Sequence, residues 1–233
     1  RFQPVQPAAY SGDELIFYGA EMESGIAGAT YNFDTKKWTA IPTFSGANHT
    51  SGHSVVYTGS GIVVWGGIDR NNNPAAVGGH FNLATGTWQK LSSQGAPDAT
   101  NGHTAVWTGE KMAVFGGFER GVDFTGKGGV YNPATDTWEA FETQLALMRE
   151  FHTAVWTGKE VLIYGGRPNR TRMHLGTVAA LDPTTLKWRA ISSKSQPEGR
   201  IGHSAVWTGS QMIIFGGTLE RGRTADDGGI FYP

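Results

Sequence analysis

The chain contains no cysteine, only 17% charged residues and no long apolar run. The absence of thiols excludes disulfides, thiolate zinc sites, iron–sulfur clusters and cysteine nucleophiles. The 19 basic and 20 acidic side chains leave a net charge of −1. This balance argues against a nucleic-acid partner, because general nucleic-acid binders carry a basic excess. No stretch approaches the ~20 apolar residues of a transmembrane helix, so no membrane span is expected.

Glycine and aromatic residues are abundant instead. Glycine accounts for 34 of the 233 residues and aromatic residues for 12%, and this glycine content is roughly twice the average. Short runs rich in valine, isoleucine and aromatic residues alternate with the Gly, Asn, Asp and Pro that tight turns require. No segment has a convincing helical period. The composition therefore predicts an all-β fold made of many short strands.

A pattern of about 50 residues recurs along the chain. Its first block has the form His-Ser/Thr-Ala/Val-Val-Tyr/Trp-Thr-Gly, its second is an aromatic residue followed by two glycines, and its third is an aromatic residue or Leu followed by Asn or Asp. A tryptophan follows seven residues after the third block begins. The repeated residues are His53, His103, His152 and His203, spaced 50, 49 and 51 residues apart, and Trp38, Trp88, Trp138 and Trp188, spaced 50 apart. Such a period indicates one structural unit repeated in space.

Each unit predicts four antiparallel strands. The histidine run forms the first strand, and the aromatic-Gly-Gly block ends the second. In the third unit, Gly128–Asn132 forms the third strand and Trp138–Phe141 the fourth. The units cover about 1–42, 43–91, 92–141, 142–191 and 192–233, and together form one domain.

On the repeated histidine, double glycine, aromatic-Asn pair and tryptophan, the chain resembles the bacterial type of the kelch-repeat β-propeller family. The resemblance covers nearly the whole chain and implies a propeller with five four-stranded blades visible. The first unit departs from the pattern, because Tyr18-Gly19-Ala20 replaces the double glycine and Gln6 stands in place of the histidine. Similar repeats occur in bacterial extracytoplasmic kelch proteins. The resemblance therefore favours an extracytoplasmic or secreted location, although it does not exclude a cytoplasmic one.

The fifth unit lacks its fourth strand and its tryptophan. Propellers close by pairing the two chain ends in one blade, which removes an exposed sheet edge. Two alternatives stay open for the closing strand. In the first, it lies outside this sequence, in a longer propeller; in the second, Arg1–Val5 closes the ring in an unusual way.

The repeated side chains are expected to be structural. The tryptophans should fill the space between blades and be largely buried. Each histidine should form hydrogen bonds with the backbone of its own or the next blade. A wide ring of four histidines cannot bring its imidazoles within ~2 Å of one ion, so neither a metal nor a cofactor is expected.

Catalysis finds little support in the sequence. It contains no nucleophile elbow, HExxH zinc motif or phosphate-binding loop. The cross-linked cysteine of kelch-like copper oxidases is ruled out by the absence of cysteine. Asp69–Asn73 matches the opening of a calcium loop, but the match fails at Pro74 and His80, so a polar turn is expected there.

Binding is expected on the long, variable loops that connect strands two and three and consecutive units, which the kelch resemblance places on one face of the ring. Arginines gather in these loops in the last two units: Arg149, Arg167, Arg170, Arg172, Arg200, Arg221 and Arg223. Guanidinium groups suit carboxylate or phosphate ligands. Pairing with neighbouring Glu and Asp residues on a solvated surface is the alternative, and the two are weighed equally.

Two functions follow from this face. The first is a non-catalytic module that binds a protein or an anionic glycan. The second is a sugar-processing enzyme resembling the kelch-type sialic acid mutarotases. A pocket lined by Arg200 and Glu198 would favour the enzyme, and a flat, wet loop face would favour the binding module.

Overall fold

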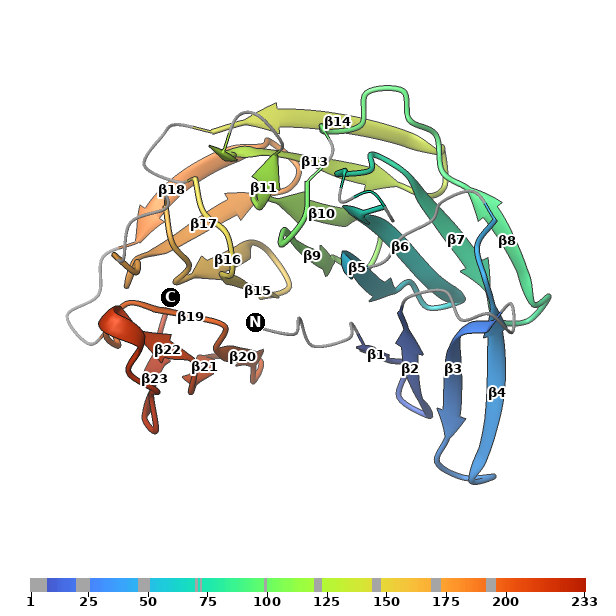
Figure 1. The fold of residues 1–233 in the computed structure, drawn as a ribbon, viewed down its shortest axis with the longest axis horizontal. Coiled ribbons are helices and arrows are strands. Elements are labelled where there is room, and N and C mark those ends of the chain that lie inside the picture. The colour runs from blue at the N-terminus through green and yellow to red at the C-terminus, as the bar shows by residue number, and fades with distance from the viewer. Residues whose placement is uncertain are drawn as a thin grey trace.

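The computed structural model describes residues 8–19, 26–45, 51–69, 71, 73–98, 100–119, 123–143, 148–168, 173–191 and 196–233. Within these ranges the secondary structure is β-strand apart from one 3-10 turn, η2 (Glu220–Gly222). Five antiparallel sheets are arranged in a ring as the blades of a β-propeller (Figure 1). The prediction of an all-β kelch-like propeller is confirmed.

Four of the blades have four strands each, in the order inner to outer. The first consists of β1 (Ala8–Tyr10), β2 (Glu14–Tyr18), β3 (Ile26–Asn32) and β4 (Lys37–Pro42). The second consists of β5 (Ser51–Tyr57), β6 (Gly61–Ile68), β7 (Gly78–Asn82) and β8 (Thr87–Lys90). The third consists of β9 (Thr104–Trp107), β10 (Met112–Phe115), β13 (Lys127–Asn132) and β14 (Thr137–Glu142). The fourth consists of β15 (Thr153–Trp156), β16 (Val161–Tyr164), β17 (Val178–Asp182) and β18 (Lys187–Ile191).

The fifth blade has three strands among the described residues: β20 (Ser204–Trp207), β21 (Met212–Phe215) and β23 (Gly228–Phe231). Two short strand pairs tie the long loops together, β11 (Phe118–Glu119) with β12 (Asp123–Phe124) and β19 (Arg200–Ile201) with β22 (Thr218–Leu219). The inner strands β1, β5, β9, β15 and β20 contact one another in that order.

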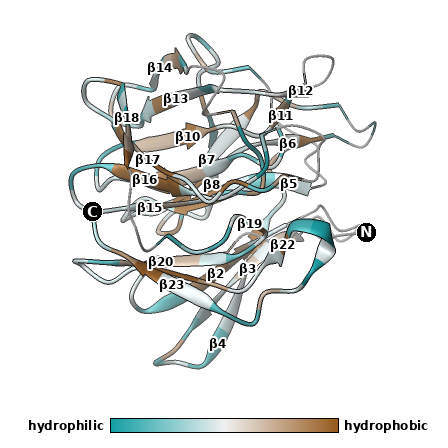
Figure 2. Ribbon diagram, turned by 90° about the vertical axis from the view of Figure 1, so that its left-hand side faces the viewer, coloured by the Kyte–Doolittle hydropathy of each residue, from teal (hydrophilic) through white to brown (hydrophobic). Residues whose placement is uncertain are grey.

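The core lies between the blades. The second strand of a blade alternates its side chains between two neighbours: Leu162 and Tyr164 pack with the fifth blade, whereas Val161 and Ile163 pack with the third. Because such a strand is buried on both faces, it is apolar throughout rather than at every second residue. The hydrophobic strands and the more polar turns can be followed in Figure 2.

The double glycines let adjacent blades approach each other. The first glycine of each pair has a positive φ, for example 69° at Gly66. A Cβ atom built on Gly66 would lie 2.5 Å from Cε1 of His103, which belongs to the next blade. Gly116 and Gly165 have the same relation to His152 and His203, with distances of 2.9 and 2.6 Å. A side chain at these positions would displace the histidine of the neighbouring blade.

The tryptophans differ in their burial. Trp138 is buried, and its ring centroid lies 4.3 Å from that of Trp65 in the preceding blade. Trp88 and Trp188 are half-buried, while Trp38 is 61% exposed. The prediction that all four are largely buried is therefore wrong for Trp38. Its face of the first blade has no preceding blade to cover it among the described residues.

Replacing Trp138 with alanine should lower the free energy of unfolding by about 3–5 kcal/mol, because the indole fills the core between the second and third blades. The same change at the exposed Trp38 should cost less than about 1 kcal/mol. Urea denaturation of the two variants measures the difference. Equal losses would contradict the assignment of Trp38 to an uncovered face.

Candidate binding face

The four repeated histidines join each blade to the one before it. Nε2 of His103 lies 3.0 Å from Oγ of Ser54, and Nε2 of His152 and His203 each lies 2.8 Å from a threonine Oγ1 of the preceding blade. His53 reaches the carbonyl oxygen of Tyr18 at 3.1 Å. The sequence predicted backbone partners in the same or the next blade. His103 does contact its own blade through Thr100, but all four reach into the preceding blade.

Burial keeps these imidazoles neutral. It lowers the pKa of His103 and of His203 to about 4, and it lowers the pKa of His53 and His152 as well. The described residues contain no group of three or more His, Asp or Glu side chains that could hold a metal ion. The hydrogen bonds of these histidines link neighbouring blades.

Arg149 and Arg200 occupy equivalent positions in the fourth and fifth blades, and both are fully buried. Nη1 of Arg149 donates to the carbonyl oxygens of Gly165 and Thr177, at 3.1 and 3.4 Å. Nη1 of Arg200 donates to those of Gly216 and Asp227, at 3.0 and 3.1 Å. Each guanidinium therefore holds the ends of strands two and three of its own blade together. Neither guanidinium has an exposed surface, so the burial of these two arginines does not support the hypothesis that they contact a ligand.

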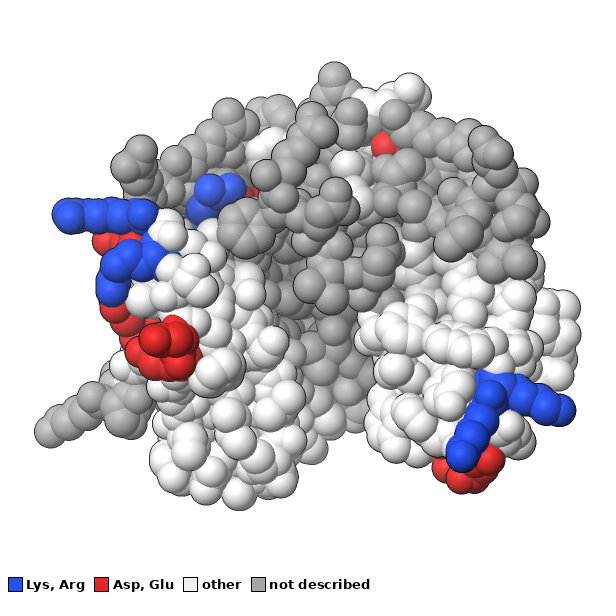
Figure 3. All heavy atoms as spheres, turned by 60° about the horizontal axis from the view of Figure 1, so that its bottom comes forward, with Lys and Arg blue, Asp and Glu red and all other residues white. Residues whose placement is uncertain are grey.

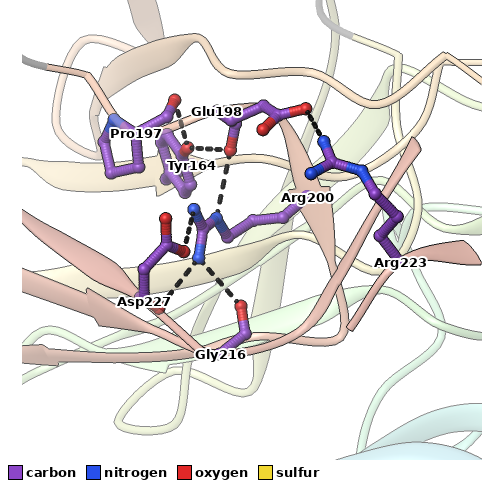
Figure 4. A network of polar contacts seen from close by, with 7 residues as sticks. All are labelled: Tyr164, Pro197, Glu198, Arg200, Gly216, Arg223 and Asp227. Carbon is purple, nitrogen blue, oxygen red and sulfur yellow. Dashed lines mark hydrogen bonds and ion pairs between the residues drawn. The ribbon is translucent and has the colours of Figure 1, made fainter. Parts of the chain in front are cut away.

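Figure 4 shows how the loop before β20 closes around Arg200. Nε of Arg200 donates to the carbonyl oxygen of Glu198 at 3.0 Å, and Nη2 lies 2.9 Å from Oδ1 of Asp227. The hydroxyl of Tyr164 lies 2.9 Å from the carbonyl oxygen of Pro197 and 3.0 Å from that of Glu198. Burial raises the pKa of Tyr164 to about 12, so this phenol remains a donor. The network is internal and holds the loop in place.

The carboxylate of Glu198 points away from Arg200. It pairs with Nη2 of Arg223 at 2.6 Å, and the two side chains are 51% and 60% exposed. Arg200 and Glu198 therefore do not line a common pocket. Figure 3 shows basic and acidic side chains next to each other on the same side of the molecule, as expected for a solvated surface.

The remaining predicted arginines have different positions. Arg221 is exposed in the turn η2 and has a positive φ of 62°. Arg170 and Arg172 lie outside the described residues. The side chain of Arg167 is 32% exposed, and its Nε and Nη2 donate to Oε1 of the buried Glu150 at 2.8 and 2.5 Å. Arg167 is thus held firmly while part of it faces solvent.

Phe151 completes the group around Arg167. Its ring centroid lies 5.5 Å from Cζ of Arg167, and the residue is 40% exposed. It stands directly before His152, at a position where the other units have Gly52, Gly102 and Gly202, and it shares their positive φ, with a value of 54°. A bulky residue in this conformation is strained, and such strain gathers at functional sites. We call Glu150, Phe151 and Arg167 the Phe151 platform.

The Phe151 platform lies at the inner end of the loop face. Phe151 precedes the inner strand β15, its carbonyl oxygen accepts a hydrogen bond from the N–H of Gly202 at 3.2 Å, and a Cβ on Gly102 would lie 3.8 Å from its ring. It therefore contacts both neighbouring blades. The sequence analysis did not select Phe151, although a phenylalanine among three repeated glycines was a visible signal.

Two cavities are lined by residues outside the Phe151 platform. One of about 260 Å³ is lined by Ala96, Pro97, Asp98 and Lys127, at the loop before the third blade. A cavity of about 470 Å³ between the second and third blades is lined by Thr58, His80, Trp107 and Glu110. It lies at the short turns, at the end of the blades opposite the long loops. Asp69, in the segment resembling a calcium loop, accepts hydrogen bonds on Oδ1 from the N–H groups of Asn71 and Asn73, both at 2.8 Å. This is the polar turn that the sequence predicts.

Comparison with known proteins agrees with this architecture. Residues 7–217 match the family model described as the KLHDC2/KLHL20/DRC7 Kelch-repeats domain. No curated protein matches the chain. The described residues contain no helix with the length and apolar character needed to cross a membrane.

Acidification should destabilise the protein through the buried histidines. In the unfolded chain they titrate near 6.5, whereas His103 and His203 in the fold have a pKa of about 4. Below pH 6.5 the unfolded chain therefore binds more protons, and stability that is fully present above this pH is lost toward pH 4. Each histidine contributes about 1.4 kcal/mol per unit of pKa difference. Denaturation between pH 7 and pH 4 should show a shallower pH dependence for His103→Gln, and an unchanged slope would contradict this.

Replacing the buried Arg200 with methionine should cost about 3 kcal/mol or more of stability, because three carbonyl groups lose a charged donor inside the protein. Arg223→Met is the matched control and should cost less than about 1 kcal/mol, because its ion pair is exposed. Thermal unfolding compares the two. A mild effect at Arg200 would reopen a role for this residue in ligand binding.

Proposed function

Since the chain belongs to the Kelch-repeats domain family described for KLHDC2, KLHL20 and DRC7, we propose that it is a non-catalytic binding module. It recognises a protein or a glycan through its loop face, and the recognised group is an anion, most simply a carboxylate. The scaffold supports this proposal, because the repeated residues maintain the fold and leave the variable loops for recognition.

The Phe151 platform is the observation that carries the proposal. Arg167 is an arginine of the loop face that is positioned by a buried carboxylate and also partly exposed. Phe151 replaces a glycine at a strained backbone position and offers apolar surface beside the guanidinium. A phenylalanine adds strain here without filling the core between the blades, so a role outside the fold accounts for it better than packing does.

The chemistry of the platform suits a ligand with an anionic group next to an apolar surface. Arginine binds carboxylate and phosphate through planar, directed hydrogen bonds, and it is less hydrated than lysine. Aromatic rings contribute contact area to protein interfaces at low entropic cost. Arg221, which is exposed in the turn η2, is proposed as a further contact. Arg170 and Arg172 lie outside the described residues, and their part in binding stays a prediction from the sequence.

The pocket that would have favoured the enzymatic alternative is not formed, because Arg200 is buried and the carboxylate of Glu198 pairs with Arg223. The binding module is therefore the function that the geometry supports better. An extracytoplasmic or secreted location remains a prediction from the resemblance of the repeats.

Phe151→Gly tests the proposed function and keeps the backbone hydrogen bond from the N–H of Gly202 to the carbonyl oxygen of residue 151. Glycine occupies this position in three other units, so the variant should be at least as stable as the parent protein. The probes are two arrays, one of acidic peptides and one of sialylated and uronate-containing glycans. The affinity for the array ligands that bind the parent protein should fall about tenfold or more in the variant, as expected when a contact worth ~1.4 kcal/mol is lost.

Arg189→Ala is the matched control. Arg189 also forms an ion pair with a glutamate in the fourth blade, at 2.6 Å from Glu160, but it lies on the outer strand β18. This variant should keep full binding. The proposal fails if Phe151→Gly binds as well as the parent protein, or if neither array retains an anionic ligand.

A further inference from the structure

The cavity of about 470 Å³ between the second and third blades lies at the end of the blades opposite the loop face. Its volume is in the range of pockets that hold small molecules. Both blades contribute to its wall, and the side chains with chemical character are Thr58, His80, Trp107, Glu110, Lys111 and Asn132. We call this cavity the His80 pocket.

His80 departs from the repeat. It lies on β7, the third strand of the second blade, and is half-buried. In the other four-stranded blades the same position is occupied by Thr30, Val130 and Ala180, which are at most 3% exposed. The second blade therefore places an imidazole beside a cavity where the others bury a smaller side chain. The junction between blades does not need a histidine here.

The hydrogen bonding of His80 leaves one ring nitrogen available. Nε2 lies 3.3 Å from Oγ1 of Thr58, whose hydroxyl donates to the carbonyl oxygen of Gly61 at 3.3 Å. Because the threonine proton is used in this way, the imidazole donates through Nε2 and keeps Nδ1 as an acceptor. Burial lowers the pKa of His80, so the ring is neutral near pH 7. Among the described residues nothing bonds to Nδ1, and this atom is not fully buried.

The third blade supplies an aromatic surface and a further polar group. Trp107 is half-buried, because it packs against the core between the two blades and also lines the cavity. Oδ1 of Asn132 accepts the N–H of Ala134 at 3.0 Å, which leaves Nδ2 of this amide as a donor. The pocket thus combines an indole wall with both a donor and an acceptor.

Glu110 and Lys111 add one negative and one positive charge to the same wall. In the part of the chain that the structure describes, neither side chain takes part in an ion pair. The equivalent turn of the fourth blade has Lys159 and Glu160, and there Glu160 pairs with Arg189 at 2.6 Å. Because the two charges in the pocket cancel, its wall suits a neutral ligand that both donates and accepts hydrogen bonds.

We propose that the His80 pocket binds a neutral sugar in its pyranose form. The C–H face of the sugar ring packs on the indole of Trp107. Its hydroxyl groups, each of which donates and accepts, bond to Nδ1 of His80, Nδ2 of Asn132 and the carboxylate of Glu110. The pocket lies at the other end of the blades from the Phe151 platform, so the inference is independent of the proposed binding function.

Heteronuclear NMR spectra of the indole N–H groups test this binding directly. The chain has 8 tryptophans, and the Trp107→Phe variant identifies the signal of Trp107 by its loss. The probes are the methyl glycosides of glucose, galactose and mannose, and adenosine is the comparison ligand with an aromatic ring. At least one glycoside should shift the Trp107 signal with a Kd on the order of 1 mM, as expected for a ligand of about 13 non-hydrogen atoms.

His80→Val removes the imidazole and introduces the residue type that the third blade has at this position, where Val130 is buried. The variant should bind the glycoside about tenfold more weakly, while its thermal unfolding temperature stays the same or rises. Glu110→Ala changes an exposed turn and should weaken binding about threefold or more. Lys159→Ala, in the equivalent turn of the fourth blade, is the matched control and should bind as the parent protein does.

Three results would overturn the proposal. In the first, no glycoside shifts the Trp107 signal, or the shifts are confined to other indoles. In the second, His80→Val and Glu110→Ala both bind the glycoside as tightly as the parent protein. In the third, adenosine shifts the Trp107 signal and the glycosides do not, which would show a pocket for an aromatic ring instead of a sugar.

Discussion

From the second blade to the fifth, each blade is joined to the next by an imidazole that occupies the space left by a glycine without a side chain. The first glycine of each pair leaves room for the ring of the next histidine, and a hydroxyl of the earlier blade lies within hydrogen-bonding distance of its Nε2. The second glycine donates its N–H to the carbonyl of Thr100, Arg149 or Arg200, at 2.9 to 3.0 Å. This contact fixes how closely the blades approach, and the burial of the second strands on both faces depends on it.

The same junction separates scaffold from surface among the arginines. The backbone carbonyl oxygens of Arg149 and Arg200 accept the glycine N–H of the preceding blade. Their side chains point into their own blades and donate to carbonyl groups at the ends of strands two and three. Arg167 follows the second glycine of its pair and emerges on the loop face, where Glu150 holds it. Burying a guanidinium is favourable only when carbonyl or carboxylate groups replace water, and the ends of strands two and three supply these groups.

The fold was predictable because its contacts repeat with the sequence. The histidine, the double glycine and the tryptophan recur in every covered blade, and one geometry satisfies all of them. The first and fifth blades differ because a contact between blades needs both partners. Trp38 has the same sequence setting as Trp138, but its surface lacks a covering blade among the described residues, so the same residue type is buried in one blade and exposed in the other.

Sequence alone determined the strand pattern, the number of repeated units and the position of the variable loops, since each of these depends on residues close together or on one period. The tertiary structure decided which arginines face solvent, which partner each histidine contacts, and that Phe151 stands beside Arg167. These features depend on segments from neighbouring blades or on two loops of one blade meeting in space. The type of a residue determines which hydrogen bonds and contacts it can form. Its burial and the partners within its reach depend on how the blades assemble into the ring.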